Sequence, residues 1–236
     1  MPRRIVILTG AGISAESGLS TFRDMDGVWA RYDWCDVATP EAFARDPERV
    51  HEFYNWRRAN LNGVEPNAAH EALGRLEQAL GERLTLVTQN VDDLHERGGA
   101  ARVIHMHGEL RRVRCEQCGG VFAWSKDLGV KTPCPQCKNP QGLRPHVVWF
   151  GEIPFHLPEI AKAIAEADQF VSIGTSGSVY PAAGFVSEAR ALGIPCMELN
   201  LEPSENAQLF CDARYGRAAE IVPLWVDEIL ACADNS

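Results

Sequence analysis

The sequence has no long hydrophobic run, no internal repeat and no low-complexity tract. A membrane-spanning helix needs about 20 consecutive apolar residues, and the apolar stretches here are short and typical of strands. The N-terminus passes from Arg4 through a short apolar run into a glycine turn at Gly10, a pattern that does not fit a signal peptide. We therefore expect a cytoplasmic protein with no membrane partner.

Basic residues are also scarce. The 236 residues include 23 Lys and Arg against 32 Asp and Glu, which gives a formal net charge of −9. Phosphate backbones and anionic lipids offer such a surface no favourable partner, which argues against general binding to nucleic acid or to membranes. With 45% hydrophobic residues, the chain can still bury a normal core.

Apolar strands alternate with helical patterns along most of the chain. The strands are expected at residues 5–8, 83–89, 169–174 and 194–200, and the helices at 68–80, 158–166, 182–192 and 224–232. This alternation predicts an α/β fold: a Rossmann-like parallel sheet with helices on both faces and ligands at the carboxyl ends of its strands. We assign this domain to residues 1–24, 68–110 and 144–236. A helical module (25–67) and a cysteine-rich module (111–143) are expected to form a smaller lobe.

The segment after the first strand has the spacing of a dinucleotide-binding turn. Gly10, Gly12 and Ala15 fit the pattern G-x-G-x-x-G/A. Glycines allow close approach of a pyrophosphate, and N–H groups at a helix start face the anion. A dehydrogenase also needs an acidic residue about 20 positions later, at the end of a strand, and residues 19–29 do not form a strand pattern. Nucleotide binding without hydride transfer is predicted, and a tight turn without a ligand is the alternative.

Four of the eight cysteines form two Cys-x-x-Cys pairs with the spacing of a zinc ribbon. Four thiolates can surround zinc tetrahedrally, and no ligand position then remains for a reactive water. We therefore predict a structural zinc ion rather than a catalytic one, with two disulfides as the alternative. The predicted ligands are Cys115, Cys118, Cys134 and Cys137.

Two histidines lie where the larger domain meets the cysteine-rich module. His107 precedes a glycine at this junction and is a candidate general base, because histidine titrates near neutral pH. A structural role is the alternative for His107. His105, two residues earlier, is expected to be strand-like and bonded within the fold.

Small and polar residues follow the later strands. The three groups are Gln89, Asn90 and Asp92; Gly174, Thr175 and Ser176; and Asn200 and Glu202. Such side chains suit ribose hydroxyls, a carboxamide or a phosphate, and the acidic Glu202 after the last strand could bind the adenosine ribose. For Asn90 and Asp92, helix capping is the alternative.

Taken together, these motifs resemble those of the sirtuins, the NAD-dependent protein lysine deacylases, over nearly all of the chain. In chain order they are Gly10-Ala-Gly-Ile-Ser14, Thr21-Phe-Arg23, Gln89-Asn-Val-Asp92, His107-Gly108, the two cysteine pairs, Val147-Val-Trp-Phe-Gly151, Gly174-Thr-Ser176 and Asn200-Leu-Glu202. The resemblance implies that NAD+ is consumed as a co-substrate, that acylated-lysine proteins are the substrates, and that nicotinamide and O-acyl-ADP-ribose are products. A monomer is expected.

The resemblance also assigns roles to individual residues. His107 is the general base, Phe22 lies near nicotinamide and Arg23 near phosphate. The implied cofactor contacts are Gly10, Ala11, Gly12, Ser14, Glu16, Phe22, Arg23, Trp29, Gln89, Asn90, Asp92, Gly174, Thr175, Ser176, Asn200, Leu201, Glu202 and Ala218. The implied contacts to the substrate peptide, which pairs in β fashion, are Val147, Val148, Trp149, Phe150 and Gly151.

The helix expected at residues 47–61 indicates which kind of acyl group the protein removes. Its apolar face carries Val50, Phe53, Tyr54 and Leu61, with Arg57 in the middle of that face. A buried guanidinium is costly without an anion, so Tyr54 and Arg57 can clamp a carboxylate. A snorkelling arginine or an internal salt bridge is the alternative.

Within the resemblance, Tyr54-x-x-Arg57 matches the class III subgroup of desuccinylases and demalonylases, and Ala15 matches its roomy acyl pocket. Removal of succinyl and malonyl groups with weaker deacetylation is expected. The loop at residues 24–27 is more acidic and bulkier than is usual in the family. Two other functions remain open: an ADP-ribosyltransferase or NAD glycohydrolase on the same scaffold, and a non-catalytic module that binds acyl-lysine or NAD.

Overall fold

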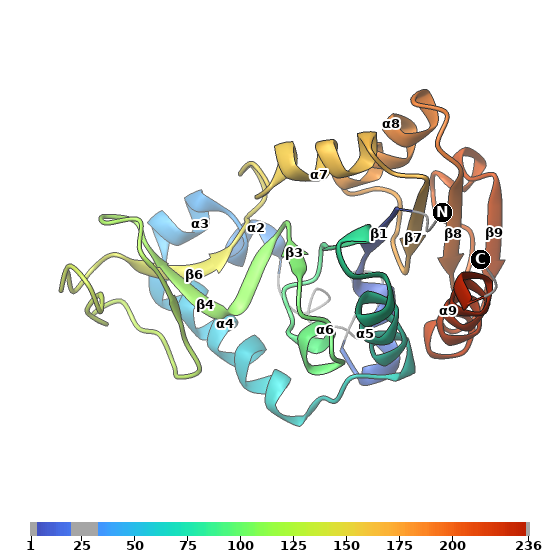
Figure 1. Cartoon of the computed structure of the whole chain (residues 1–236). Helices are drawn as coiled ribbons and strands as arrows, with labels where there is room; N and C mark the ends of the chain where they lie inside the picture. The colour runs from blue at the N-terminus through green and yellow to red at the C-terminus, as the bar shows by residue number, and fades with distance from the viewer. Residues whose placement is uncertain (1–3, 20–32, 235–236) are drawn as a thin grey trace.

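The computed structural model describes residues 4–19 and 33–234, and its larger domain is built on one parallel sheet (Figure 1). The strand order is β3-β2-β1-β7-β8-β9. The chain extends the sheet from β1 to one side and then returns to continue from β7 on the other side. The order reverses beside β1, and such switch points are where α/β sheets bind ligands. The strands are β1 (Ile5–Thr9), β2 (Leu84–Thr88), β3 (Val103–His105), β7 (Gln169–Ile173), β8 (Cys196–Asn200) and β9 (Asp212–Tyr215).

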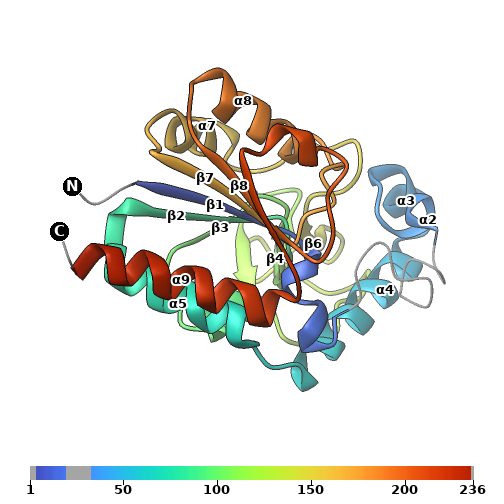
Figure 2. The same ribbon diagram turned by 90° about the vertical axis from the view of Figure 1, so that its right-hand side faces the viewer.

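Helices cover both faces of this sheet, as Figure 2 shows. Side chains alternate along a strand, so Ile5 and Ile7 pack with α5 (Ala68–Leu80) and α9 (Ala218–Asp234). Val6 and Leu8 pack on the opposite face with α7 (Leu157–Ala165) and α8 (Phe185–Ala191). The predicted fold class is confirmed.

A smaller lobe lies at the far end of the molecule, on the left in Figure 1. It contains α2 (Trp34–Val37), α3 (Pro40–Arg45), α4 (Pro47–Asn60) and an antiparallel sheet of order β5-β4-β6. Local sequence explains the helix starts: Thr39 and Asp46 accept hydrogen bonds from the first turns of α3 and α4, and each is followed by proline. The strands are β4 (Gly108–Cys115), β5 (Val121–Ala123) and β6 (Leu143–Val147).

Some local predictions were wrong. The glycine turn opens into two short 3₁₀ turns, η1 (Ala11–Ile13) and η2 (Ala15–Ser17), rather than into an α-helix. The last helix begins at Ala218 and carries Pro223 inside it, so the predicted start at residue 224 is too late. The sequence pattern also missed β9, which has only four residues. Among the helices of the described residues, none is long and apolar enough to cross a membrane.

Candidate active site

Two glycine-containing loops contact each other at the switch point. Thr9 at the end of β1 lies in register with Ile173 at the end of β7. The Gly12 N–H donates to the Gly174 carbonyl at 2.9 Å, and a Cβ on Gly12 would lie 2.8 Å from the Gly174 Cα. Gly174 itself has φ of +62°. The glycine spacing is therefore required by the approach of these two loops, as well as suiting a ligand phosphate.

The structure brings three predicted cofactor residues together beside this turn. The Asn90 side chain donates to the Gly10 carbonyl and to Ser14 Oγ, each at 3.1 Å. Ser14 Oγ in turn donates to Asp92 at 3.3 Å and contacts His70 Nε2 at 3.3 Å. Burial raises the pKa of the Asp92 carboxyl to about 6 and lowers that of His70 to about 4. The site therefore offers a desolvated polar cluster at the sheet edge, which suits a polar cofactor.

Helix capping, the alternative role for Asn90 and Asp92, applies to only one of these two residues. Asp92 accepts from the backbone N–H of Leu94 at 3.2 Å, at the start of α6 (Leu94–Arg97). Asn90 instead joins the β2 loop to the glycine turn. Capping thus accounts for part of the role of Asp92 and for none of the side-chain bonds of Asn90.

Other predicted cofactor residues have roles within the fold. Glu16 accepts a hydrogen bond at 2.8 Å from the backbone N–H of Ala219, which follows Ala218 at the start of α9. Asn200 donates to the Thr175 carbonyl at 2.8 Å and so joins the loops after β7 and β8. Leu201 and Glu202 are exposed beside it. Phe22, Arg23, Trp29 and the loop at 24–27 lie outside the described residues.

His107 is oriented by the loop after β2. Its Nδ1 lies 3.0 Å from the Gln89 carbonyl, which can only accept, so Nδ1 carries the proton and Nε2 has the basic lone pair in the neutral ring. Burial lowers the pKa of His107, although the bond to Gln89 opposes this shift. A neutral imidazole with one oriented acceptor nitrogen is the form that a general base needs.

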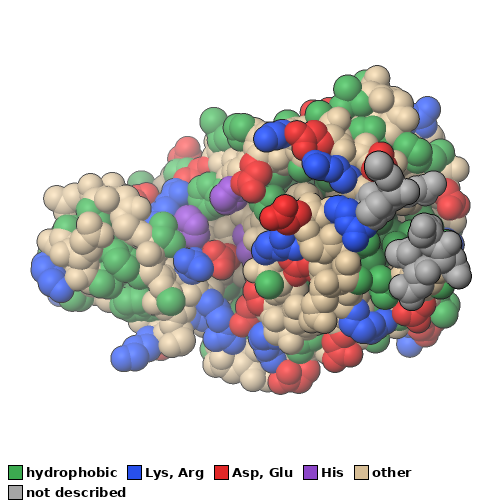
Figure 3. All heavy atoms as spheres, viewed as in Figure 1, with side chains coloured by type: hydrophobic (Ala, Val, Ile, Leu, Met, Phe, Trp, Pro, Cys, Tyr) green, Lys and Arg blue, Asp and Glu red, His purple; other side chains and the backbone are tan. Residues whose placement is uncertain are grey.

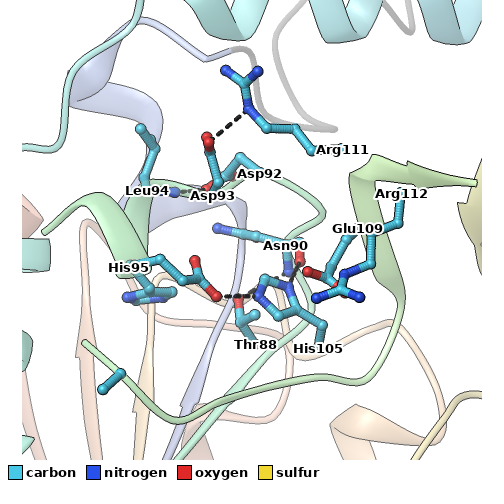
Figure 4. Close-up of polar contacts among 12 residues, drawn as sticks. Thr88, Asn90, Asp92, Asp93, Leu94, His95, His105, Glu109, Arg111 and Arg112 are labelled. Atoms are coloured by element: carbon cyan, nitrogen blue, oxygen red, sulfur yellow. Dashed lines mark hydrogen bonds and ion pairs between the residues drawn. The ribbon is translucent and has the colours of Figure 1, made fainter. Parts of the chain in front are cut away.

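His105 has a different environment, which Figure 4 shows. It ends β3, and its two ring nitrogens lie 2.6 Å from a Glu96 carboxylate oxygen and 3.3 Å from the Asn90 carbonyl. Burial acts to lower the pKa of His105, but the hydrogen bond and charge of Glu96 outweigh it and raise the pKa. Because both partners are acceptors, this environment favours the imidazolium form of His105. His105 is bonded within the fold as predicted.

Two residues predicted to set the acyl specificity, Tyr54 and Arg57, lie on α4. Val50, Phe53, Tyr54 and Leu61 are all at most 2% exposed, as the helical spacing predicted. The Arg57 guanidinium lies over the Phe53 and Tyr54 rings, 5.7 and 5.9 Å from their centroids. Burial lowers the pKa of Arg57, while Tyr54 and the charge of Asp92 oppose this shift. An anion entering here would further offset the desolvation of the guanidinium.

The segment 147–151, predicted to bind the substrate peptide, is hydrogen-bonded to His107 and to Tyr54. The Val148 N–H donates to the His107 carbonyl at 2.9 Å, and the Trp149 indole N–H donates to the Tyr54 hydroxyl at 2.9 Å. Hydrogen bonds, chain neighbours and the charge interaction of Arg57 with Asp92 thus connect the predicted site residues in one continuous network. Its members are His107, Val148, Trp149, Tyr54, Arg57, Asp92, Ser14, Asn90 and Gln89. Figure 3 shows histidine side chains near the hollow where the small lobe meets the larger domain.

The four predicted metal ligands also come together. Their sulfur atoms all lie within 4.8 Å of one another, and the Cys115–Cys137 and Cys118–Cys134 pairs are each 3.7 Å apart. Tetrahedral zinc with bonds of about 2.3 Å places neighbouring sulfurs about 3.8 Å apart, whereas a disulfide needs about 2.05 Å. The geometry fits one structural zinc ion and not two disulfides.

A protein-family model described as the Sir2 family matches residues 10–181. The chain belongs to the Sir2 family. This Sir2 chain is 59% identical over 231 residues to an NAD-dependent protein deacylase from Caulobacter vibrioides, covering 97% of each chain. It is 55% identical over 234 residues to a protein of the same name from Yersinia pseudotuberculosis, covering 98% of this chain and 84% of that one. A solved Sir2 homologue–NAD complex has a TM-score of 0.86 at 38% identity, covering 97% and 90% of the two chains.

An ion pair between the buried Arg144 and the partly buried Glu152 supports this site, and the sequence patterns did not reveal it. Arg144 is 2% exposed, bonds both carboxylate oxygens of Glu152 at 2.8 and 3.0 Å, and lies 3.2 Å from the centroid of the Trp149 ring. Glu152 also accepts from the Trp149 backbone N–H at 2.8 Å. Opposite charges flanking the segment 147–151 could have suggested this support. Their distance in space was not available from the sequence.

Removing one metal ligand is expected to destabilise this Sir2 chain. Cys134→Ser should lower bound zinc well below about one ion per chain and lower Tm by roughly 10 °C, because losing a buried ligand costs several kcal/mol. Metal analysis and thermal unfolding measure both effects. Cys35→Ser, which alters an exposed cysteine outside the cluster, is the matched control. If the Cys134→Ser variant lost its zinc but kept the Tm of the parent protein, the structural role assigned to the zinc ion would be wrong.

Proposed function

We propose that this protein removes succinyl and malonyl groups from lysine side chains in preference to acetyl groups. The general activity follows from its family and from the names of its relatives: it is an NAD-dependent protein deacylase that acts on acylated protein. The preference rests on one observation, which is the partly buried Arg57 guanidinium over the Tyr54 ring on α4.

A carboxylate is the group that this arrangement suits best. The guanidinium offers several donors and no acceptor, and it binds carboxylates with two parallel hydrogen bonds. Tyr54 can add a third donor, because burial raises its pKa and keeps the hydroxyl protonated. Succinyl and malonyl groups end in a carboxylate, whereas acetyl does not. Ala15, whose side chain is a single methyl group, would leave room for the longer acyl chain.

The described residues are suited to holding NAD+. The Gly10–Gly12 turn and Gly174 would lie against the phosphates, and the polar cluster of Ser14, Asn90 and Asp92 would line the nicotinamide pocket. When bound, NAD+ would supply an electrophilic ribose C1′ for the acyl oxygen, with nicotinamide as the leaving group. His107 then accepts a ribose hydroxyl proton at Nε2, and Gln89 holds the ring in the required tautomer. With one water molecule consumed as the bond between the lysine nitrogen and the acyl carbon breaks, the proposed products are the free lysine, nicotinamide and O-acyl-ADP-ribose.

The substrate peptide would pair with the segment 147–151 chiefly through the backbone carbonyls of that segment. The N–H groups of Val148, Trp149 and Phe150 are already bonded to His107, Glu152 and Ala38. A carbonyl has two lone pairs and can accept from a further strand. The proposal therefore has the peptide donating N–H groups to this segment.

An acyl-peptide panel tests the proposed function. One peptide carrying acetyl, malonyl or succinyl lysine is assayed with NAD+, and nicotinamide release and deacylated peptide are both measured. We expect kcat/KM for succinyl and malonyl to exceed that for acetyl by at least about 10-fold, since a buried charged hydrogen bond contributes about 1.5–3 kcal/mol.

The same assay separates the other functions. Nicotinamide release that does not depend on acyl-lysine, with ADP-ribose appearing on protein, would favour an ADP-ribosyltransferase or NAD glycohydrolase. No nicotinamide release with any peptide would favour a non-catalytic binding module. If kcat/KM were highest for the acetyl peptide, the proposed succinyl and malonyl specificity would be wrong and the deacylase activity would stand.

A further inference from the structure

Trp149 makes a side-chain hydrogen bond that its role in peptide binding does not require. Its indole N–H donates to the Tyr54 hydroxyl at 2.9 Å, and both side chains are 2% exposed. The two ring centroids are 6.3 Å apart. A buried indole N–H is costly when unpaired, so this bond fixes the relative positions of the two rings.

The Trp149 ring is held firmly on its other side. Arg144 lies over it at 3.2 Å from the centroid, and the Phe43 ring packs at 5.2 Å. The backbone N–H of Trp149 is bonded to Glu152, which is in turn bonded to Arg144. The indole N–H therefore has a fixed direction, toward the Tyr54 oxygen.

The Tyr54 oxygen accepts a hydrogen bond from the Trp149 indole N–H. The Arg57 guanidinium lies 5.9 Å from the centroid of the Tyr54 ring, and its charge interacts with Tyr54. An indole N–H is a donor only, so the bond from Trp149 uses a lone pair of the Tyr54 oxygen. The O–H hydrogen of Tyr54 must then point away from Trp149.

We propose that Trp149 is a positioning residue for acyl specificity: its indole N–H orients the Tyr54 hydroxyl so that Tyr54 donates its hydrogen to the acyl carboxylate. This inference rests on the proposed succinyl and malonyl specificity. A hydroxyl without the Trp149 donor can rotate and present a lone pair to the carboxylate, which repels it. An acetyl group has no carboxylate and so gains nothing from this orientation.

The test removes the N–H and keeps the ring. Trp149→Phe is compared with the parent enzyme on succinyl and acetyl versions of one peptide. We expect the ratio of kcat/KM for succinyl to that for acetyl to fall about 10-fold, mainly through a higher KM for the succinyl peptide, because the carboxylate contact is equal in ground and transition states. Trp56→Phe, at an exposed tryptophan of α4, is the matched control and should leave this ratio unchanged.

A double-mutant comparison shows whether the effect acts through Tyr54. In a Tyr54→Phe background there is no hydroxyl to orient, so Trp149→Phe should change the ratio less than 2-fold, and the two effects should not add. Equal loss on both substrates, or the same fall in both backgrounds, would overturn the inference. If Trp149→Phe fails to fold, benzothienylalanine at position 149 preserves the bicyclic shape and removes only the N–H.

The outcomes separate this inference from the function beneath it. If Tyr54→Phe and Arg57→Met lower the succinyl-to-acetyl ratio but Trp149→Phe does not, the specificity stands and the role of Trp149 fails. If Tyr54→Phe and Arg57→Met leave the ratio at its parent value, the proposed clamp fails, and the inference fails with it.

Discussion

His107→Asn is expected to lower kcat/KM by about 1,000-fold for succinyl, malonyl and acetyl peptides alike. General-base catalysis contributes typically about 10²–10⁴-fold, and the base acts after any of these acyl groups has bound. The structure supports this role because the Gln89 carbonyl fixes the proton on Nδ1 and leaves Nε2 to accept one. Steady-state deacylation of the three peptides measures the effect.

His156→Asn is the matched control for this variant. His156 is exposed, and its φ of +61° is one that asparagine tolerates better than most residues. It should lose less than about 2-fold in kcat/KM. NAD+ affinity and Tm of the His107 variant should stay near the parent values, which shows that the site is intact. A loss confined to one acyl group would contradict the assignment of His107 as the shared base.

The pH dependence of the parent enzyme gives a second measurement of the same residue. Burial lowers the pKa of His107 below its usual value near 6.5. The basic form therefore persists to lower pH, and the acid limb of kcat/KM should have its midpoint below 6.5. A midpoint well above 6.5 would mean that the titrating base is not His107 in this environment.

Arg57→Met is expected to lower kcat/KM for the succinyl peptide by about 100-fold, and for the acetyl peptide far less. Removing one partner of a buried, hydrogen-bonded charge pair costs about 2–5 kcal/mol, and about 2.7 kcal/mol corresponds to 100-fold. Methionine preserves much of the length and apolar packing of the arginine stem, so the loss reports on the guanidinium. The ratio of the two kcat/KM values is the measured quantity.

Arg49→Met provides the control on the same helix. Arg49 is 48% exposed and bonded to Asp36, away from the acyl residues, and a surface ion pair of this kind contributes little. Its replacement should change neither kcat/KM value by more than about 2-fold. An equal fall on both substrates for Arg57→Met would indicate a structural role and would count against the clamp.

Local patterns in the sequence were sufficient for the architecture. Alternating apolar segments predicted the parallel sheet and its two helical layers, because burial on both faces imposes a short-range pattern on each strand and helix. The paired Cys-x-x-Cys motifs predicted the metal site, since ligand spacing is a local property. The face of α4 containing Tyr54 and Arg57 also followed from helical periodicity alone.

Contacts between distant segments were not accessible in this way. His105 and His107 are only two residues apart, yet the pKa of His105 is raised by Glu96 and the pKa of His107, which Gln89 orients, is lowered by burial. Their protonation depends on Glu96 and on loops from other strands, and no local pattern encodes those positions. The helix start expected after Gly10 consists of two short 3₁₀ turns, in a loop that contacts the distant Gly174.

The sequence by itself determined the fold class, the zinc ligands and the set of polar residues at the strand ends. Only the tertiary structure decided which distant residues meet in the site: Ser14 with Asp92, Val148 with His107, and Trp149 with Tyr54. Periodicity fixes which face of an element is buried, but hydrogen bonds depend on atomic positions that many distant residues set together. The Arg144–Glu152 pair that holds Trp149 is the clearest example, because its effect on the site depends wholly on packing across the small lobe.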